Sequence, residues 1–162
     1  MRVEPLPEPV ARVADFLRAA GAEARLEEFA GGTPTAREAA EAVGCDLSRI
    51  VKSLVFLCDS RPVLVLVPGN RRADAAKIAG VVGAGRVRVA RPEEVLDITG
   101  FEPGAVAPFP LRRVDRVLVD RTLVFDDLVW IGAGSTRHMA GLPAGELLRL
   151  TRAEPVDVAD EG

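Results

Sequence analysis

Cysteine and histidine are scarce in this chain of 162 residues, which holds two cysteines, Cys45 and Cys58, and a single histidine, His138. The cysteines are 13 positions apart and form no Cys-x-x-Cys pair, so the sequence disfavours a zinc site, which is built mainly from Cys and His. A thiol hydrolase that uses Cys58 and His138 is disfavoured too, because nothing in the spacing places a sulfur beside the one imidazole. We expect no bound metal and interpret both cysteines as small apolar residues on buried faces.

Aromatic residues and long apolar runs are also few. Six Phe, one Trp and no Tyr are too few to supply the stacking platforms that hold unpaired bases, so sequence-specific reading of a strand is disfavoured. Contact through phosphate and sugar, with one terminal nucleotide in a pocket, stays open. The strongest apolar run, residues 63–67, is far shorter than the roughly 20 residues of a membrane-spanning helix. Residues 1–9 hold two acids and three prolines where a signal peptide would be apolar, so we expect a cytoplasmic protein.

The net charge of −3 hides an uneven distribution of charge along the chain. Residues 1–48 carry a net charge of −4, residues 49–91 carry +7, and residues 92–162 carry −6. The middle block could form a positive face that attracts a polyanion. Alternatively, its basic residues scatter over several faces and pair with acids of the flanking segments. Charge alone does not separate these two arrangements.

The length and composition predict one α+β domain over residues 1–162. With 48% apolar residues, a chain of this size buries enough surface to need no disulfide. Apolar periodicity predicts a mixed, mostly antiparallel central sheet flanked by helices, and the acidic end at residues 159–162 is expected to be frayed. The apolar hairpin expected at residues 50–58 and 62–67 indicates a sheet covered on both faces. Helices are expected at residues 9–20, 35–43, 72–80, 92–98 and 143–150, further strands at residues 24–29, 86–90, 116–119, 128–131, 136–140 and 155–158, and chain breaks at residues 31–34 and 100–110.

Lysine is rare in this chain, because only Lys52 and Lys77 are lysines among 21 basic residues. Lys77 falls in a helix with a polar face, and we interpret it as a solvated residue. Lys52 falls in the apolar stretch 50–57, a predicted interior strand, where an ammonium group must point out at the strand end or lie in a polar pocket. A compact ammonium group suits one phosphate or carbonyl oxygen. We therefore favour a functional site over an edge position that simply faces water.

Two glycine-rich segments could complete such a site. In residues 104–108, glycine lets successive N–H groups point into one cavity and proline fixes the far end, as in an oxyanion hole, although ordinary turns use the same residues. In residues 132–138, a glycine-rich strand connection leads to His138. A lone histidine is more often a structural hydrogen-bonding residue than a catalyst.

The order of several sequence pieces is more specific than any one of them. The pieces are Thr35-Ala36-x-Glu38-Ala39-Ala40, Lys52-Ser53-Leu54-Val55-Phe56, Gly104-x-x-x-Pro108-Phe109, Asp120-x-x-Leu123, and Gly132-x-Gly134-Ser135 followed by His138 and Leu142. Over residues 8–156, this order resembles the YbaK/prolyl-tRNA synthetase-associated domain family, whose members are aminoacyl-tRNA deacylases. Because nothing flanks the domain in this sequence, the resemblance implies the free-standing form and the fold of that family.

The resemblance implies residue roles at the matching positions only. Lys52, Gly104 and His138 match family positions and are expected to be catalytic. The family's Lys-Thr-Leu is Lys-Ser-Leu here, the Ser or Thr that often precedes the loop proline is Ala107, and Phe29 stands near a position where many members carry a polar ring. These departures concern the amino acid that is recognised. The residues expected to bind substrate are Phe29, Ser53, Ala105, Val106, Ala107, Pro108, Gly134 and Ser135.

The function implied by the resemblance is hydrolysis of the ester that joins a mischarged amino acid to the 3′-terminal adenosine of a tRNA. The reaction would be trans-editing of tRNA(Pro) or a related tRNA. An aminoacyl ester is already activated, so a positioned water and an oxyanion hole suffice, without a protein nucleophile, metal or organic cofactor. Expected partners are the acceptor 3′ end of aminoacyl-tRNA and an aminoacyl-tRNA synthetase, but neither a membrane nor DNA. The alternative is a non-catalytic tRNA- or synthetase-binding module of the same fold.

The scarcity of cysteine and histidine gives a first prediction. Cys45→Ser and Cys58→Ser should each keep deacylation of mischarged tRNA within a few-fold of the wild-type rate, apart from any loss of stability caused by a buried hydroxyl. Single-turnover deacylation, with circular dichroism to confirm folding, measures this. A trapped thioester, or loss of the reaction in folded Cys58→Ser protein, would restore the thiol hydrolase interpretation.

Overall fold

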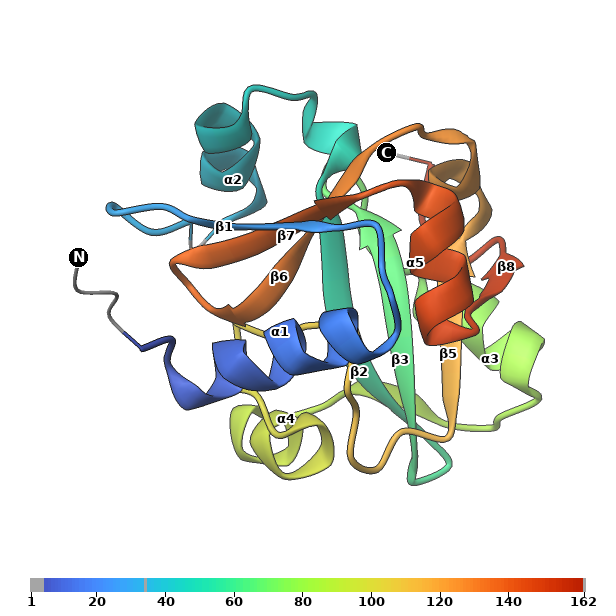
Figure 1. The fold of residues 1–162 in the computed structure, drawn as a ribbon. Coiled ribbons are helices and arrows are strands. Elements are labelled where there is room, and N and C mark those ends of the chain that lie inside the picture. The colour runs from blue at the N-terminus through green and yellow to red at the C-terminus, as the bar shows by residue number, and fades with distance from the viewer. Residues whose placement is uncertain (1–4, 34, 162) are drawn as a thin grey trace, which may run out of the picture.

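A computed structural model describes residues 5–33 and 35–161 (Figure 1). Residues 1–4, the expected chain break at Pro34 and the last residue of the acidic end, Gly162, lie outside the described residues. Helices alternate with strands that form two sheets, one purely antiparallel and one mixed. The α+β prediction is therefore confirmed.

The helices begin and end at the signals that the sequence carries. The side chain of Thr35 accepts a hydrogen bond from the Glu38 amide at 3.1 Å, and Gly44 ends the same helix in a left-handed conformation. Among residues 5–33 and 35–161, no helix is long and apolar enough to cross a membrane. The helices are α1 (Glu8–Ala19), α2 (Ala36–Val43), α3 (Ala75–Val82), α4 (Pro92–Thr99) and α5 (Ala144–Thr151), with short 3-10 turns at η1 (Leu47–Arg49) and η2 (Arg121–Phe125).

Helix α3 begins three residues later than residue 72, where the sequence placed it. The Asp74 carboxylate accepts from the amides of Ala76 and Lys77 at 3.0 and 3.2 Å, so it caps the helix at that point. The backbone just before this cap is paired with the C-terminal segment instead, through an antiparallel bridge between Ala73 and Ala159. The residues predicted to form the first turn of this helix therefore pair with the C-terminal segment instead.

The predicted hairpin forms the centre of a five-stranded sheet. β2 (Val51–Cys58) and β3 (Arg61–Pro68) pair antiparallel along their whole length, joined by a two-residue turn in which Asp59 and Ser60 have positive φ. The strand order is β4-β2-β3-β5-β8, with β3, β5 and β8 parallel. The outer strands are β4 (Val87–Val89), β5 (Arg116–Asp120) and β8 (Glu154–Val156).

A second sheet stands where a single central sheet was predicted. β1 (Arg25–Glu28), β7 (His138–Leu142) and β6 (Val129–Ser135) form a separate antiparallel sheet in the order β1-β7-β6. An isolated bridge between Ile50 and Trp130 connects it to the larger sheet. The glycine-rich residues 132–135 belong to β6 itself, and the turn to β7 falls at residues 136 and 137, which were predicted to be strand. Glycine in a strand resembles a connection in sequence, which explains this error.

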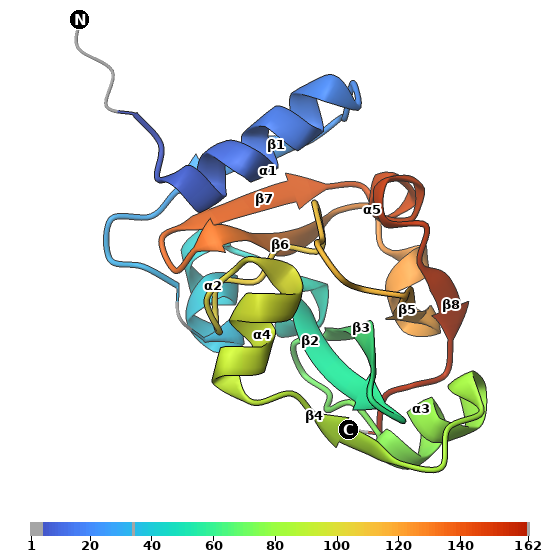
Figure 2. The same cartoon turned by 90° about the horizontal axis from the view of Figure 1, so that it is seen from below.

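Both faces of the β2–β3 hairpin are buried, as its apolar sequence predicts. Leu64 and Leu66 lie in the core shared with α1, β6 and β7, whereas Val65 and Val67 lie in the core closed by α3 and Val158. All four of these β3 side chains are 0% exposed. Figure 2 shows α1 and α3 on opposite sides of the molecule, with the two sheets between them.

The acidic end is not frayed over the residues that are described. Ala159 is 0% exposed, and the Asp160 amide donates to the Arg72 carbonyl at 2.8 Å. A run of acidic residues predicts a solvated tail, but residues 159 and 160 pair with the segment that follows β3. The preceding residue Val158 is also fully buried, which fixes the segment in place.

The close approach of β6 to α1 generates a prediction about Gly134. This glycine has φ of 101°, and a Cβ atom there would lie 2.8 Å from the carbonyl oxygen of Pro9. Gly134→Ala should therefore lower the free energy of unfolding by about 2 kcal/mol or more, measured by urea denaturation. The matched control is Gly145→Ala, because a Cβ at exposed Gly145 meets nothing within 4 Å and alanine favours its helix. Equal stability of the two variants would contradict this account.

Candidate functional site

A cavity of about 290 Å³ lies where the start of β2 meets α2, the 104–108 loop and the β6–β7 hairpin. Its lining combines small apolar side chains with hydroxyl, ammonium and imidazole groups. The lining residues are Thr33, Thr35, Ala36, Ala39, Ile50, Val51, Lys52, Ser53, Leu54, Gly104, Val106, Gly132, Ser135, His138 and Met139.

The cavity brings together six of the residues that the sequence singled out, from positions 52 to 138 of the chain: Lys52, Ser53, Gly104, Val106, Ser135 and His138. The other five lie outside its lining. Phe29 packs beside Trp130 and Met139, and Gly134 lies against Pro9. Ala105, Ala107 and Pro108 are buried. Substrate contact by these five residues stays a prediction.

Several lining residues were missed by sequence reasoning. Thr35 was identified as a helix cap, but it also faces the cavity together with Ala36 and Ala39 of the same helix. Gly132 is required by the structure, because a Cβ there would lie 2.8 Å from the Val106 carbonyl oxygen. Its signal in the sequence is its place inside an apolar strand. A glycine inside an apolar strand often marks the close approach of another backbone. Here that backbone is the 104–108 loop.

Lys52 lies half-buried at the beginning of β2, where the sequence placed an ammonium group needing a polar pocket. Its Nζ donates a hydrogen bond to the main-chain carbonyl of Arg71. Burial lowers the pKa of Lys52 below its usual value, the Asp160 carboxylate opposes this shift, and the Arg72 guanidinium adds to it. An ammonium group with one carbonyl partner keeps two donors for a ligand.

His138 is 4% exposed and is held from one side of its ring. The Arg137 amide donates to Ser135 Oγ at 3.0 Å, and that hydroxyl is hydrogen-bonded to His138 Nδ1 at 2.7 Å. His138 Nε2 lies 3.1 Å from a Glu28 carboxylate oxygen but makes no hydrogen bond with it.

Two buried polar atoms of the cavity residues lack a hydrogen-bond partner within the part of the chain that the structure describes. They are His138 Nε2 and Ser53 Oγ. Buried polar atoms are nearly always paired, so a pair of exceptions in one cavity points to a ligand that completes them. The cavity is thus suited to a small polar group with both donors and acceptors.

The 104–108 loop presents backbone N–H groups beside the cavity. Gly104 has φ of 81°, which turns the chain sharply, and the Ala105 amide is used by the Glu102 carbonyl at 3.0 Å. Among the described residues, the amides of Val106 and Ala107 have no hydrogen-bond partner. Successive unused N–H groups in a bent loop can hold an anionic oxygen.

Neither cysteine lines this cavity, and only Cys58 is buried, whereas Cys45 is half-buried. Cys58 is at the turn end of β2, about 20 Å from Lys52 along the strand, and lines a separate cavity of about 60 Å³. Burial raises the pKa of the Cys58 thiol, and Asp59 raises it further. Burial also raises the pKa of Cys45. Within residues 5–33 and 35–161, no cluster of three His, Cys, Asp or Glu side chains could hold a metal ion.

The positive block, residues 49–91, does not form one face. Lys52, Arg71 and Arg72 lie at the cavity end of the β2–β3 hairpin, because the Lys52 ammonium bonds the Arg71 carbonyl. Arg61 and Arg86 lie at the opposite end, where Arg61 pairs with Cys58 across the turn and the Arg86 carbonyl accepts from the Asp59 amide. The sequence left open either one positive face or basic residues scattered over several faces. The structure combines the two, because the basic residues lie at both ends of the hairpin and only some of them lie at the cavity.

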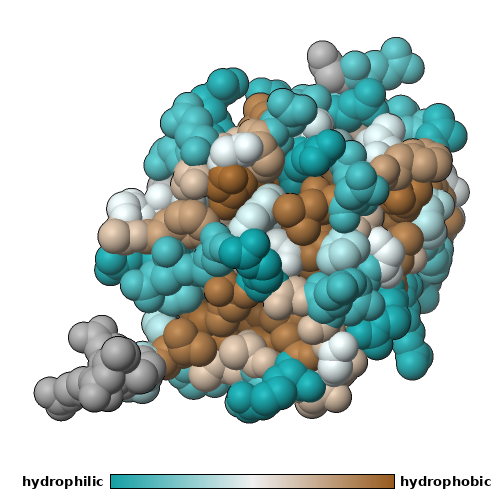
Figure 3. Space-filling model, turned by 45° about the horizontal axis from the view of Figure 1, so that its top comes forward, coloured by the Kyte–Doolittle hydropathy of each residue, from teal (hydrophilic) through white to brown (hydrophobic). Residues whose placement is uncertain are grey.

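Acidic partners neutralise other members of the block. Arg88 pairs with Glu94 at 2.8 Å. Lys77, expected to be solvated, is partly buried and donates to Asp157 at 3.0 Å and to the Ala159 carbonyl at 2.8 Å. Figure 3 shows apolar patches between the hydrophilic residues of one face.

Comparison with known proteins finds the same kind of domain. A family model described as an aminoacyl-tRNA editing domain matches residues 30–150. The chain is 34% identical over 107 residues to a proline--tRNA ligase of Lactobacillus gasseri, covering 66% of this chain and 19% of the ligase. It thus spans about a fifth of that relative's length. It is 35% identical over 123 residues to the uncharacterized protein YwhH of Bacillus subtilis, covering 75% of this chain and 78% of YwhH.

Solved structures share the fold over nearly the whole chain. A candidate trans-editing enzyme for prolyl-tRNA synthetase is 36% identical, with a TM-score of 0.90 over 96% of this chain and 99% of that one. The hypothetical protein APE2540 is 31% identical, with a TM-score of 0.86 over 92% of this chain and 99% of its own.

Proposed function

The chain belongs to the aminoacyl-tRNA editing domain family, and from this premise we propose that it hydrolyses the ester bond of mischarged aminoacyl-tRNA. One observation carries the proposal: the Lys52 ammonium, the unpartnered Ser53 hydroxyl and the unused Val106 amide surround or adjoin one cavity. These are groups that bind oxygen atoms of an ester and a ribose. A deacylation screen over Ala-, Cys-, Ser- and Pro-charged tRNA tests it directly.

In the proposed reaction, water attacks the ester carbonyl and the negative charge develops on the carbonyl oxygen. Within residues 104–108, the unused Val106 amide stabilises that oxyanion, and such a donor is worth about 3–4 kcal/mol of barrier in comparable sites. Lys52 holds the terminal nucleotide or the ester region, while Ser135 and His138 line the space for the amino acid. The bond between the acyl carbon and the ribose oxygen then breaks, and that oxygen takes up the proton that the attacking water releases, so the products are the free amino acid and the ribose hydroxyl of the terminal adenosine. The ester is reactive enough to need no protein nucleophile.

The proposed partner is the acceptor 3′ end of tRNA(Pro) or a related tRNA, acting together with an aminoacyl-tRNA synthetase. The similarity to segments of proline--tRNA ligases supports this choice, since the names of those relatives specify proline and tRNA. Arginines at the cavity end of the hairpin, Arg71 and Arg72, supply positive charge for phosphates next to the terminal nucleotide. Because the proposed substrate is an aminoacyl-tRNA, we place the proposed activity in the cytoplasm.

Lys52 should be required as a lysine and not only as a positive charge. The longer planar guanidinium of Lys52→Arg cannot occupy the point from which Nζ reaches the Arg71 carbonyl, and a displacement of about 1 Å in a catalytic arrangement can cost about 100-fold. Lys52→Ala and Lys52→Arg should both fold but lose about 100-fold in single-turnover deacylation. The matched control Arg88→Lys exchanges the cation type at a surface pair on β4 and should keep the wild-type rate. A nearly unchanged rate in Lys52→Arg would reduce Lys52 to one more surface charge.

Binding of tRNA should depend on the cavity end of the positive block. Affinity should fall as salt rises, because phosphate contacts release counterions, and Arg71→Ala with Arg72→Ala should weaken binding and flatten that salt slope by about 2 units. The matched control is Arg61→Ala with Arg86→Ala, which removes two charges at the turn end of the hairpin and should leave the slope unchanged. Filter binding over a salt series measures both pairs. Equal effects of the two pairs would place the RNA elsewhere.

A further inference from the structure

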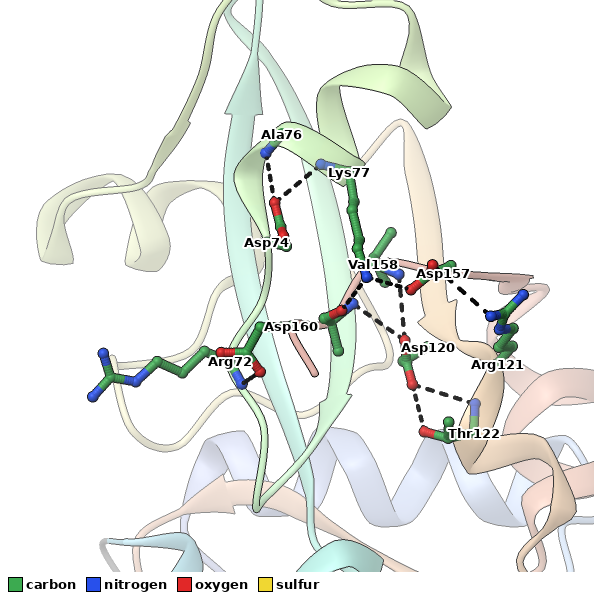
Figure 4. Close-up of polar contacts among 11 residues, drawn as sticks. Arg72, Asp74, Ala76, Lys77, Asp120, Arg121, Thr122, Asp157, Val158 and Asp160 are labelled. Carbon is green, nitrogen blue, oxygen red and sulfur yellow. Dashed lines mark hydrogen bonds and ion pairs between the residues drawn. The ribbon is translucent and has the colours of Figure 1, made fainter. Parts of the chain in front are cut away.

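A buried carboxylate fastens the terminal segment, residues 157–160, to the end of β5. Asp120 is 1% exposed, and its Oδ1 accepts from the amides of Val158 and Ala159 at 3.3 and 3.2 Å. Its Oδ2 accepts from the amide and the hydroxyl of Thr122 (Figure 4). Four donors on one carboxylate leave it little freedom, so the terminal segment is held at a defined place.

The terminal segment in turn holds the chain that follows β3. Ala159 forms an antiparallel bridge with Ala73, and the Asp160 amide donates to the Arg72 carbonyl at 2.8 Å. Asp160 Oδ1 accepts from the Arg72 amide at 3.1 Å, as Figure 4 shows. Lys77 Nζ adds a bond of 2.8 Å to the Ala159 carbonyl. The Arg72 backbone is therefore held on both its N–H and its carbonyl side.

One planar peptide group connects this fastening to Lys52. The Arg72 amide that donates to Asp160 and the Arg71 carbonyl that accepts from Lys52 Nζ belong to the same peptide unit. Because that unit is rigid and planar, fixing its N–H fixes the direction of its carbonyl. A carboxylate at the N–H also polarises the peptide, which strengthens the carbonyl as an acceptor for the ammonium.

We propose that Asp120 and Asp160 are positioning residues for Lys52. Asp120 fixes the terminal segment, and Asp160 orients the Arg71–Arg72 peptide whose carbonyl holds the ammonium group. Any effect of Asp120 and Asp160 on the deacylation rate rests on the proposed function, in which Lys52 contacts the substrate. Their effect on the position of the Lys52 ammonium group does not depend on that function.

The charges around Lys52 provide a readout that a purely structural role would not change. Burial lowers the pKa of Lys52, Asp160 raises it, Arg72 lowers it, and His138 lies in the same cavity. Replacing Asp160 with Asn keeps an oxygen acceptor for the Arg72 amide but removes the negative charge. The pKa of Lys52 should then fall further, so that the ammonium loses its proton at lower pH than in the wild type.

The experiment uses the fact that Lys52 and Lys77 are the only lysines in the chain. Lysine labelled with carbon-13 at Cε gives two NMR signals, which Lys52→Ala assigns, and each is followed through a pH titration. In Asp160→Asn, the Lys52 midpoint should move to lower pH while the Lys77 midpoint stays. The matched control is Glu161→Gln, since Glu161 raises the pKa of Lys77 and should affect that signal alone.

Asp120→Asn tests the other half of the proposal. The amide cannot accept from all four donors, so the terminal segment should loosen, the Lys52 signal should shift, and single-turnover deacylation should fall on the order of 10-fold. The affinity for tRNA should stay within about 2-fold, because the arginine side chains that meet phosphate are unchanged. Should Asp120→Asn fail to fold, Asp160→Asn carries the test alone.

The outcomes separate this inference from the proposed function. An unmoved Lys52 midpoint in Asp160→Asn, or equal movement in Asp160→Asn and Glu161→Gln, overturns the positioning role. A Lys52 midpoint that moves as expected supports that role even in a protein that deacylates no tRNA, and the absent reaction then overturns the proposed function. A rate that falls in Asp160→Asn together with the Lys52 midpoint supports both.

Discussion

β2 and β3 pair over eight residues each, and water is excluded from both faces of this hairpin. A hairpin buried on both faces must be covered twice, and the covering layers come from distant parts of the chain. One face is covered by α1 and by β6 and β7, and the other by α3 and the terminal segment. Of these covering elements, β6 and β7 also line the cavity.

Lys52 places a charged side chain on this hairpin, both faces of which are otherwise buried. On β2, residues alternate between the two cores, and Lys52 follows the register that carries Phe56 and Cys58 toward α3. A bare ammonium group in such a place would be costly, so a peptide carbonyl satisfies one of its donors. The terminal segment, which holds the peptide that carries this carbonyl, is therefore part of the surroundings that allow a lysine to remain in the strand.

The cavity forms where the two sheets separate. They touch at the bridge between Ile50 and Trp130, and residues of the 104–108 loop line the cavity together with residues of both sheets. Gly132 lets that loop approach to the strand backbone, because any side chain there would meet the Val106 carbonyl.

The sequence by itself determined the elements whose signals are local: the Thr35 cap, the hairpin and most helix bounds. It also identified Lys52 and the two glycine-rich segments, since an isolated lysine among apolar residues and a run of glycines can be read over a few positions. Tertiary structure alone decided that the sheet divides, that residues 72–74 pair with residues 158–160, and that Arg71 is the partner of Lys52. Hydrophobic periodicity and caps act within a few residues, whereas these contacts join residues up to 88 positions apart and depend on how finished elements pack.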